Sequence, residues 1–160
     1  MSGSTDPILI QLSKAPSRRE GSFIIPPDKT IPGSPLDWLT RAKGNLALAK
    51  QPKPEGAFWE DQCFLAQQAA EKAIKAVYQH KHLFFRYTHD LEELGKGLED
   101  NGVPVPSAVK EAVVLVRYAF ETRYPGPFEP VTEEEYRETI RLAEAVVDWA
   151  ESIVRGQDYS

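Results

Sequence analysis

The stretch CFLAQQAAEKAIKAVY, residues 63–78, decides the fold, because its small and apolar residues return every three or four positions. This spacing places them on one face of an α-helix. With the tryptophan before it, the stripe comprises Trp59, Cys63, Ala66, Ala70, Ala73, Ile74 and Val77. It predicts a helix over about 57–82. Alanine has almost no side chain, so neighbouring helices can approach closely, and we expect this helix to be the central one.

The chain after residue 34 is helical in pattern throughout. Ser34 followed by Pro35 is typical of a helix start, and the sequence QPKPEG, residues 51–56, ends that first helix. Thr88 or Asp90 is expected to cap a short helix that follows the central one. The buried edge of that short helix is formed by Leu91, Leu94 and Leu98.

Two further helices complete the pattern. One is predicted from about Ser107 to Arg123, with an apolar face formed by Val109, Ala112, Val113, Val116, Ala119 and Phe120. The last begins at TEEE, where Thr132 and Glu135 have the spacing of a capping box, and continues to about Val154. No segment alternates with period two for long enough to form a sheet. The sequence therefore predicts an all-α protein, an antiparallel up-and-down bundle of four to five helices.

Prolines divide the chain into an arm and a bundle. They stand at positions 7, 16, 26, 27 and 32, which forbids a long helix there. We expect residues 1–34 to form an extended arm, 35–156 the bundle and 157–160 a short tail. The arm's apolar groups ILIQL and SFII could lie along the domain or a partner, and the alternative is a flexible tail of no defined role.

Composition excludes several classes of protein. The chain is 41% hydrophobic, and no apolar run approaches the roughly 20 residues that span a bilayer. The single cysteine, Cys63, excludes an internal disulfide, and no secretory signal opens the chain, so we expect a cytoplasmic protein without membrane contact. A net charge of −5 argues against broad nonspecific binding of nucleic acids.

No cofactor or metal is expected. The sequence has no glycine loop that would cradle a phosphate after a strand. His80 and His82 could bind zinc together with His89, but side chains two residues apart on a helix point in different directions.

Apolar residues beyond one core predict an interface. On the central helix, Phe64 lies away from the alanine stripe, in a sector with Gln68, Glu71 and Lys75, and Tyr78 lies at its edge. The last helix carries a second apolar stripe, made of Leu142, Val146, Trp149 and Ile153. We therefore predict a symmetric homodimer that covers these residues. The alternative is that both helices are buried on two sides within one bundle.

Several separated motifs, in this order, resemble the HEPN domain (higher eukaryotes and prokaryotes nucleotide-binding). They are FLAQQAAEKAIKAVY, THDLEEL, RYP and TEEEYRETIRLAEAVVDWAESIV, and the resemblance extends from about Leu36 to Val154. It implies a bundle of four or five helices that commonly dimerises. It also implies functions that range from RNA cleavage to nucleotide binding and to partnership with a minimal nucleotidyltransferase in toxin–antitoxin pairs.

The ribonuclease members of the family carry an arginine followed four to six residues later by a histidine, late in the bundle. Here the histidines stand only at 80, 82 and 89, so Arg117, Arg123 and Arg137 have none behind them. Histidine is the usual group that moves protons near neutral pH. We therefore predict no catalytic residues and a noncatalytic dimer that binds a nucleotide or a partner protein, with a nucleotidyltransferase favoured. The alternative is a ribonuclease toxin with a diverged site around Arg123, Tyr124 and His89.

The resemblance also points to a set of polar residues that could bind a ligand or anion: Gln68, Glu71, Lys72, Lys75, His89, Asp90, Arg123 and Tyr124. Arg123 falls on the same predicted face as Val116 and should need a carboxylate, Glu71 or Asp90, or else a ligand anion. In the structural interpretation Arg123, Asp90 and His89 tie helix ends together. In the binding interpretation Arg123, Lys72 and Lys75 hold an anion or nucleotide.

Overall fold

The computed structural model describes residues 30–120, 125–127 and 129–156. The described helices all belong to one unit, residues 32–160. These residues contain no β-strand, which confirms the all-α prediction. The arm before Thr30, the side chain of Phe120, Arg123, Tyr124 and the tail 157–160 lie outside the described residues, and what the sequence predicts for them stays a prediction.

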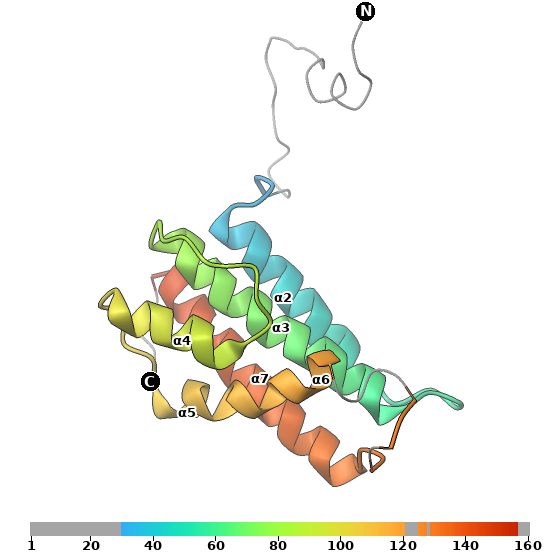
Figure 1. The fold of residues 1–160 in the computed structure, drawn as a ribbon. Coiled ribbons are helices and arrows are strands. Elements are labelled where there is room, and N and C mark those ends of the chain that lie inside the picture. Colours follow the sequence, from blue (N-terminus) through green and yellow to red (C-terminus); the bar gives the residue numbers. More distant parts are fainter. Residues whose placement is uncertain (1–29, 121–124, 128, 157–160) are drawn as a thin grey trace, which may run out of the picture. The chain divides into compact units, whose positions relative to one another are not determined.

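The elements follow one another as a chain of helices with short connections (Figure 1). In order they are α2 (Pro35–Ala49), α3 (Trp59–His80), α4 (Leu91–Asp100), α5 (Ser107–Lys110), the 3₁₀-helix η1 (Glu111–Val116), α6 (Arg117–Phe120) and α7 (Glu133–Val154).

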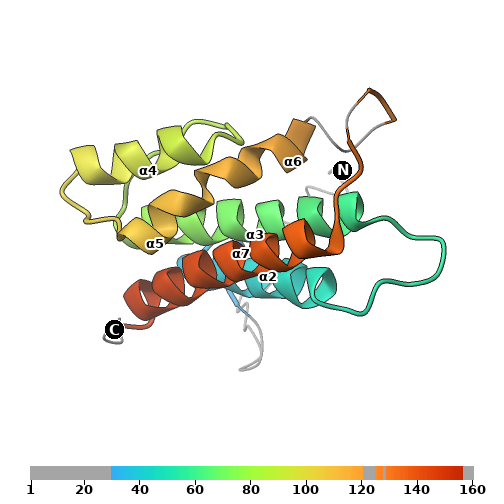
Figure 2. The same ribbon diagram turned by 90° about the horizontal axis from the view of Figure 1, so that it is seen from below.

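Helix α3 is the centre of the bundle, as the alanine stripe predicted. It contacts α2, α4, η1, α6 and α7. Its small residues Ala66, Ala69, Ala70, Ala73 and Ala76 are completely buried. Figure 2 shows α2 on one side of α3 and α7, with α4 and the α5–η1–α6 segment on the opposite side. Because nearly every side of α3 is covered, polar residues on this helix must find partners within the protein.

The predicted helix starts are confirmed by their caps. The Ser34 hydroxyl accepts a hydrogen bond from the amide of Asp37, and Asp90 accepts from two amides in the first turn of α4. Thr132 and Glu135 form the complete capping box at the start of α7. Each cap satisfies amides that have no partner inside the helix, which explains why these starts could be predicted.

The helix predicted over 107–123 is not a continuous α-helix. Its middle, η1, is a 3₁₀-helix, in which every third residue faces the same way. The buried residues up to Tyr118 accordingly follow a spacing of three, at Val109, Ala112, Leu115 and Tyr118, and Ala119 is buried as predicted. Val113 and Val116, predicted to be buried, are only partly so, and Val114 is 56% exposed. The run of β-branched valines has low α-helix propensity, which favours this departure.

The chain itself buries four of the six residues that the sequence assigned to a dimer interface: Tyr78, Leu142, Val146 and Trp149. Helix α7 contacts α2, α3, α5 and η1, and three of the four residues of its second apolar stripe are buried within one bundle. The assignment of Tyr78, Leu142, Val146 and Trp149 to an interface is therefore wrong. Phe64 and Ile153 are partly exposed, and their assignment stays a prediction.

Within the part of the chain that the structure describes, no helix is both long and apolar enough to cross a membrane.

The contact between Tyr78 of α3 and helix α4 depends on a glycine. The Tyr78 hydroxyl donates a hydrogen bond to the carbonyl of Leu94 at 2.6 Å, and a Cβ atom at Gly97 would collide with that hydroxyl. We predict that Gly97→Ala lowers the free energy of unfolding by about 1–3 kcal/mol, the usual cost of overpacking. Urea unfolding followed by circular dichroism measures this.

Gly95→Ala is the matched control on the same helix. A Cβ atom there meets nothing within 4 Å, and alanine favours a helix interior by roughly 0.5–1 kcal/mol over glycine. Gly95→Ala should therefore be neutral or stabilising. Equal stability of the two variants would show that the contact with Tyr78 does not constrain α4.

Candidate functional site

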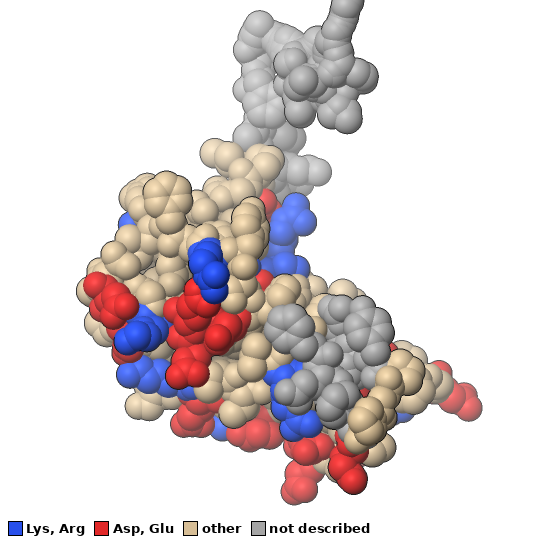
Figure 3. Space-filling view, viewed as in Figure 1, with Lys and Arg blue, Asp and Glu red and all other residues tan. Residues whose placement is uncertain are grey.

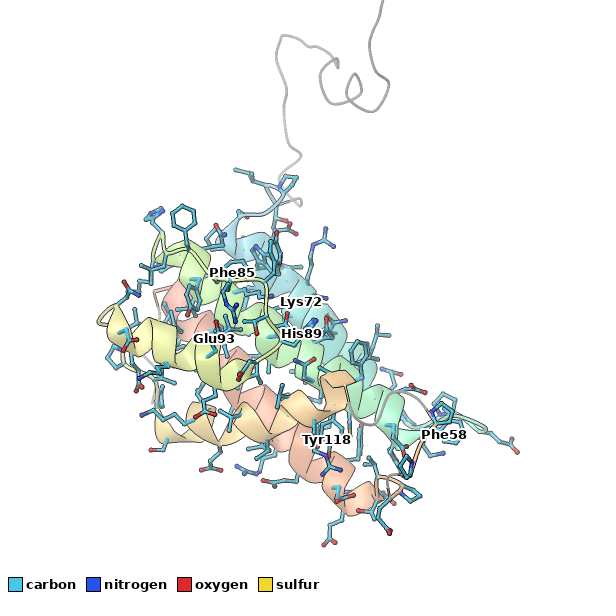
Figure 4. The ribbon with its side chains drawn as sticks, in the orientation of Figure 1. Phe58, Lys72, Phe85, His89, Glu93 and Tyr118 are labelled. Carbon is cyan, nitrogen blue, oxygen red and sulfur yellow. The ribbon has the colours of Figure 1, made fainter. Side chains whose placement is uncertain are left out.

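Three polar side chains of α3 lie along one buried face. Gln67, Glu71 and Lys75 are four residues apart, and their exposed fractions are 0%, 5% and 4%. Helical spacing placed Glu71 and Lys75 on the side away from the alanine stripe, and the chain covers that side itself. Trp38 of α2 lies over it, together with residues 83–90, which we call the strap (Figure 4).

The Glu71 carboxylate accepts hydrogen bonds from three directions. Lys75 Nζ lies 2.7 Å from one oxygen, and the other accepts from His89 Nδ1 at 2.7 Å and from Gln67 Nε2 at 3.1 Å. Because a carboxylate only accepts, Nδ1 of His89 carries the proton. Gln68 donates in turn to Gln67 at 2.8 Å. We call these five residues the Glu71 cluster.

The cluster keeps Glu71 ionised. Burial by itself would raise the pKa of this carboxyl, but the hydrogen bonds from Lys75, His89 and Gln67, together with the Lys75 charge, outweigh it and lower the pKa below the ordinary glutamate value. A buried carboxylate is tolerated only when it is paired in this way.

Aromatic rings enclose the Lys75 ammonium. Its Nζ atom lies 5.9 Å from the ring centre of Trp38, 5.2 Å from Phe85 and 5.8 Å from Tyr87. Each distance is within the range of a cation–π interaction. Phe85 also packs edge-on against Trp38 and Tyr78. Lys75 therefore joins α3 to α2 and to the strap.

The strap is fixed at both ends and at its middle. At its start the amide of Leu83 donates to the carbonyl of Tyr78, and at its end Asp90 caps α4. Arg86 makes two hydrogen bonds to Glu93, at 2.7 and 2.8 Å. His89 reaches inward to Glu71 although 47% of its side chain is exposed. The Glu71 cluster is thus open to solvent at His89.

Lys72 lies beside the cluster with a different partner. Its Nζ donates to Asn45 Oδ1 of α2 at 2.6 Å, and within the described residues no carboxylate forms an ion pair with it. Burial lowers the pKa of this ammonium, and the charges of Arg41 and Lys75 lower it further, while Glu71 opposes them. Lys72 is therefore a partly buried cation held by a neutral oxygen.

The structure brings together Gln68, Glu71, Lys72, Lys75 and His89 from the predicted binding set. Asp90 serves as the cap of α4. Arg123 and Tyr124 lie outside the described residues, so the pairing predicted for Arg123 stays a prediction. Glu71, one of its two expected carboxylate partners, already accepts from three donors.

Sequence reasoning missed Gln67, Trp38, Phe85 and Tyr87. Gln67 carried a signal, because it stands one turn before Glu71 and can bond to it. The three aromatic residues had no such signal, since helical spacing does not show which connection folds over a face. The sequence FFRY, residues 84–87, only marked the strap as unusually aromatic.

Cys63 is a packing residue, as its place on the apolar stripe predicted. It is completely buried, and burial raises the pKa of its thiol to about 11. A reactive cysteine needs an accessible thiolate, so Cys63 is not a nucleophile at neutral pH.

The buried pair predicts a characteristic pattern of stabilities. Lys75→Met removes the ammonium and leaves Glu71 buried, which should cost about 3–5 kcal/mol of unfolding free energy. The double variant Glu71→Gln and Lys75→Met leaves no buried charge and should recover most of that loss. Denaturant unfolding of the wild type, the single variants Glu71→Gln and Lys75→Met and the double variant gives the coupling energy between the two side chains. Additive losses would show that the two side chains do not interact.

The same pair predicts a pH dependence. The pKa of Glu71 is lower in the folded than in the unfolded chain, so its ionised form stabilises the fold fully above the ordinary glutamate value of about 4.3. That contribution is lost as the pH falls through the folded value. The stability difference between wild type and Glu71→Gln should therefore be largest near pH 7 and shrink below about pH 4. A difference that stays constant down to about pH 2 would contradict it.

Comparison with known proteins gives the family. The family model of the HEPN domain matches residues 36–153. The crystal structure of TT1696 from Thermus thermophilus is similar, with 33% identity, a TM-score of 0.64, and coverage of 74% of this chain and 97% of that one. ST0689, described as an archaeal HEPN homologue, shares the fold at 24% identity, a TM-score of 0.59, and coverage of 76% and 98%. None of the curated proteins matches. The chain belongs to the HEPN domain family.

Proposed function

We propose that this HEPN domain is a binding module without catalytic activity of its own, and that it holds a nucleotide beside the Glu71 cluster. The observation that carries the proposal is Lys72, a partly buried ammonium whose described acceptor is the neutral oxygen of Asn45. A cation in such a place is stabilised by an anion, and a phosphate group supplies one with several acceptor oxygens.

The neighbouring groups suit a phosphate ligand. Gln68 is partly exposed and His89 half-exposed, and both lie in the hydrogen-bond network around Glu71. Lys75 is not available, because its charge is matched by Glu71 and enclosed by three rings. Lys72 is therefore the cation that we assign to the ligand, and its hydrogen bond to Asn45 holds it beside the buried pair.

The network also supports a noncatalytic role. Both oxygens of Glu71 already accept hydrogen bonds, so this carboxylate is not free to act as a general base. The ribonuclease alternative depends on Arg123 and Tyr124, which lie outside the described residues.

Partner binding remains part of the proposal. A minimal nucleotidyltransferase of a toxin–antitoxin pair and a symmetric homodimer are both what the family resemblance implies. Phe64 and Ile153 are the residues of the predicted interface that are still partly exposed, so they are the positions at which we propose that a second copy meets the chain.

Nucleotide binding tests the proposal. ATP should bind the wild-type protein in a calorimetric titration, and Lys72→Met should weaken binding at least tenfold, because a charge-assisted hydrogen bond is worth roughly 1.5–3 kcal/mol. Lys43→Met is the control, since Lys43 is a half-exposed lysine of α2 that pairs with Glu151. It makes the same change of charge and should leave ATP affinity unchanged.

Two outcomes would contradict this function. One is equal ATP affinity in the Lys72→Met and Lys43→Met variants. The other is cleavage of RNA by the purified wild-type protein that disappears in Arg123→Ala, which would establish the ribonuclease alternative.

A further inference from the structure

A hollow of about 340 Å³ lies between α4 and the α5–η1 segment, on the side of α3 away from α2 (Figure 2). Helix α4 lines it with one helical face, whose residues Glu92, Gly95, Lys96 and Glu99 are three or four positions apart. This volume is at the lower end of the range of ligand sites, about 300–1,000 Å³. The hollow is therefore large enough for a small molecule.

The inner part of the hollow is apolar. It is lined by four buried aliphatic residues and a partly buried one, in order Ile74, Leu91, Val105, Val109 and Val113. On the α4 side Gly95 has no side chain, and a Cβ atom added there meets nothing within 4 Å. Apolar walls that face an unfilled space lack part of their packing contacts, so an apolar group that enters the hollow is stabilised.

Four charged side chains form the rim of the hollow, and acidic and basic side chains lie next to one another over α4 (Figure 3). Lys110 of α5 pairs with Glu99 of α4 at 2.8 Å, so these two charges match each other. Glu92 and Lys96 stand one turn apart, in the order that favours an ion pair on a helix, yet within the described residues neither forms one. The rim therefore has one unmatched charge of each sign beside the apolar hollow.

We propose that this hollow binds a free apolar α-amino acid. Its side chain lies among the aliphatic residues, its ammonium pairs with Glu92 and its carboxylate pairs with Lys96. An α-amino acid carries both charges next to each other at one end of an apolar chain, which complements the unmatched charges of the rim. A cavity of about 150 Å³ accommodates benzene, so this hollow, roughly twice as large, holds a phenyl ring and leaves room for the charged end.

The inference goes beyond the proposed function. The hollow contains neither Lys72 nor a member of the Glu71 cluster. Lys72 bonds to Asn45 of α2, and α2 lies on the opposite side of α3 from α4 and α5 (Figure 2). The amino acid and the nucleotide would therefore occupy separate sites on two sides of the central helix.

Ligands with a single charge suit the rim less well. A carboxylate without an ammonium places its charge near Glu92, a like charge, and an amine without a carboxylate does the same near Lys96. Three compounds that share the phenyl ring separate these cases. They are L-phenylalanine, 3-phenylpropanoate, which lacks the ammonium, and 2-phenylethylamine, which lacks the carboxylate.

Titration of the ¹⁵N-labelled full chain with L-phenylalanine, followed by two-dimensional NMR, tests the inference. The amide resonances of Gly95, Val109 and Val113 should move and reach saturation, because these residues line the hollow. Affinity for 3-phenylpropanoate and for 2-phenylethylamine should be roughly two- to fivefold lower, the usual effect of losing an exposed ion pair. Equal affinity for the three compounds, or no saturable shift with phenylalanine, would overturn the proposal.

Gly95→Leu fills the hollow from the α4 side. Its side chain takes the place of the ligand, so phenylalanine binding should weaken at least tenfold. The variant should be at least as stable as wild type, because leucine favours a helix interior over glycine and buries apolar surface. Gly44→Leu is the matched control on α2, where a Cβ atom also meets nothing within 4 Å, and it should bind phenylalanine as wild type does. Equal affinity in the two variants would show that the ligand does not occupy the hollow.

Charge variants locate the two ends of the ligand. Glu92→Gln should weaken the binding of phenylalanine severalfold but not that of 3-phenylpropanoate, which has no ammonium to lose a partner. Lys96→Met should weaken the binding of phenylalanine but not that of 2-phenylethylamine. If each variant instead weakens only the compound that it should spare, the assigned pairing of charges is wrong.

The outcomes also separate this inference from the proposed function. Lys72→Met should lose affinity for ATP and keep its affinity for phenylalanine, because Lys72 is not part of the hollow. If ATP binds and phenylalanine does not, the amino-acid site alone fails. If phenylalanine binds in the hollow and ATP does not bind, the nucleotide site alone fails.

Discussion

The carboxylate of Glu71 and the ammonium of Lys75 are buried together on one face of α3. Removing both charges from water costs desolvation free energy that the surrounding groups must offset. Gln67 and His89 donate hydrogen bonds to the oxygen of Glu71 that Lys75 does not contact, and three aromatic rings lie around the Lys75 ammonium. Apart from Gln67, which belongs to α3 itself, these partners come from α2 and from the connection to α4. The pair therefore determines which segments must cover this side of the central helix, while the alanines determine how closely the other helices approach.

This division of α3 also places Lys72, the residue that we connect with function, beside the buried pair. Phe85 and His89 point inward to the buried pair, and Phe84 is left facing solvent. Tyr87 is largely exposed as well, but its ring lies 5.8 Å from the Lys75 ammonium. Lys72 stands one residue after Glu71 and so projects beside the cluster. Groups that stabilise the fold thus position the groups that we propose for binding, and the same helix provides both.

The sequence predicted the elements that depend on local interactions. The caps at Ser34, Asp90 and Thr132 and the alanine stripe of α3 are confirmed, since each depends on residues a few positions apart. It failed where the outcome depends on distant segments. Helical spacing identified a second apolar stripe on α7, but it could not show that the chain itself would bury Trp149. Spacing along α3 grouped Glu71 with Lys75. It missed Phe85, because spacing along a helix carries no information about which segment folds over that helix.

Lysine-selective NMR of the full chain tests the enclosure of Lys75 most directly. Protons that lie over aromatic rings are shifted upfield by the ring currents, and Lys75 Nζ lies over three rings. We predict one lysine with ε-proton resonances well upfield of the others, which disappears in Lys75→Met and moves toward the others in Phe85→Leu. A spectrum in which all lysine ε-protons resonate together, as in an unfolded peptide, would show that the ammonium is not enclosed and would contradict the central role of the buried pair.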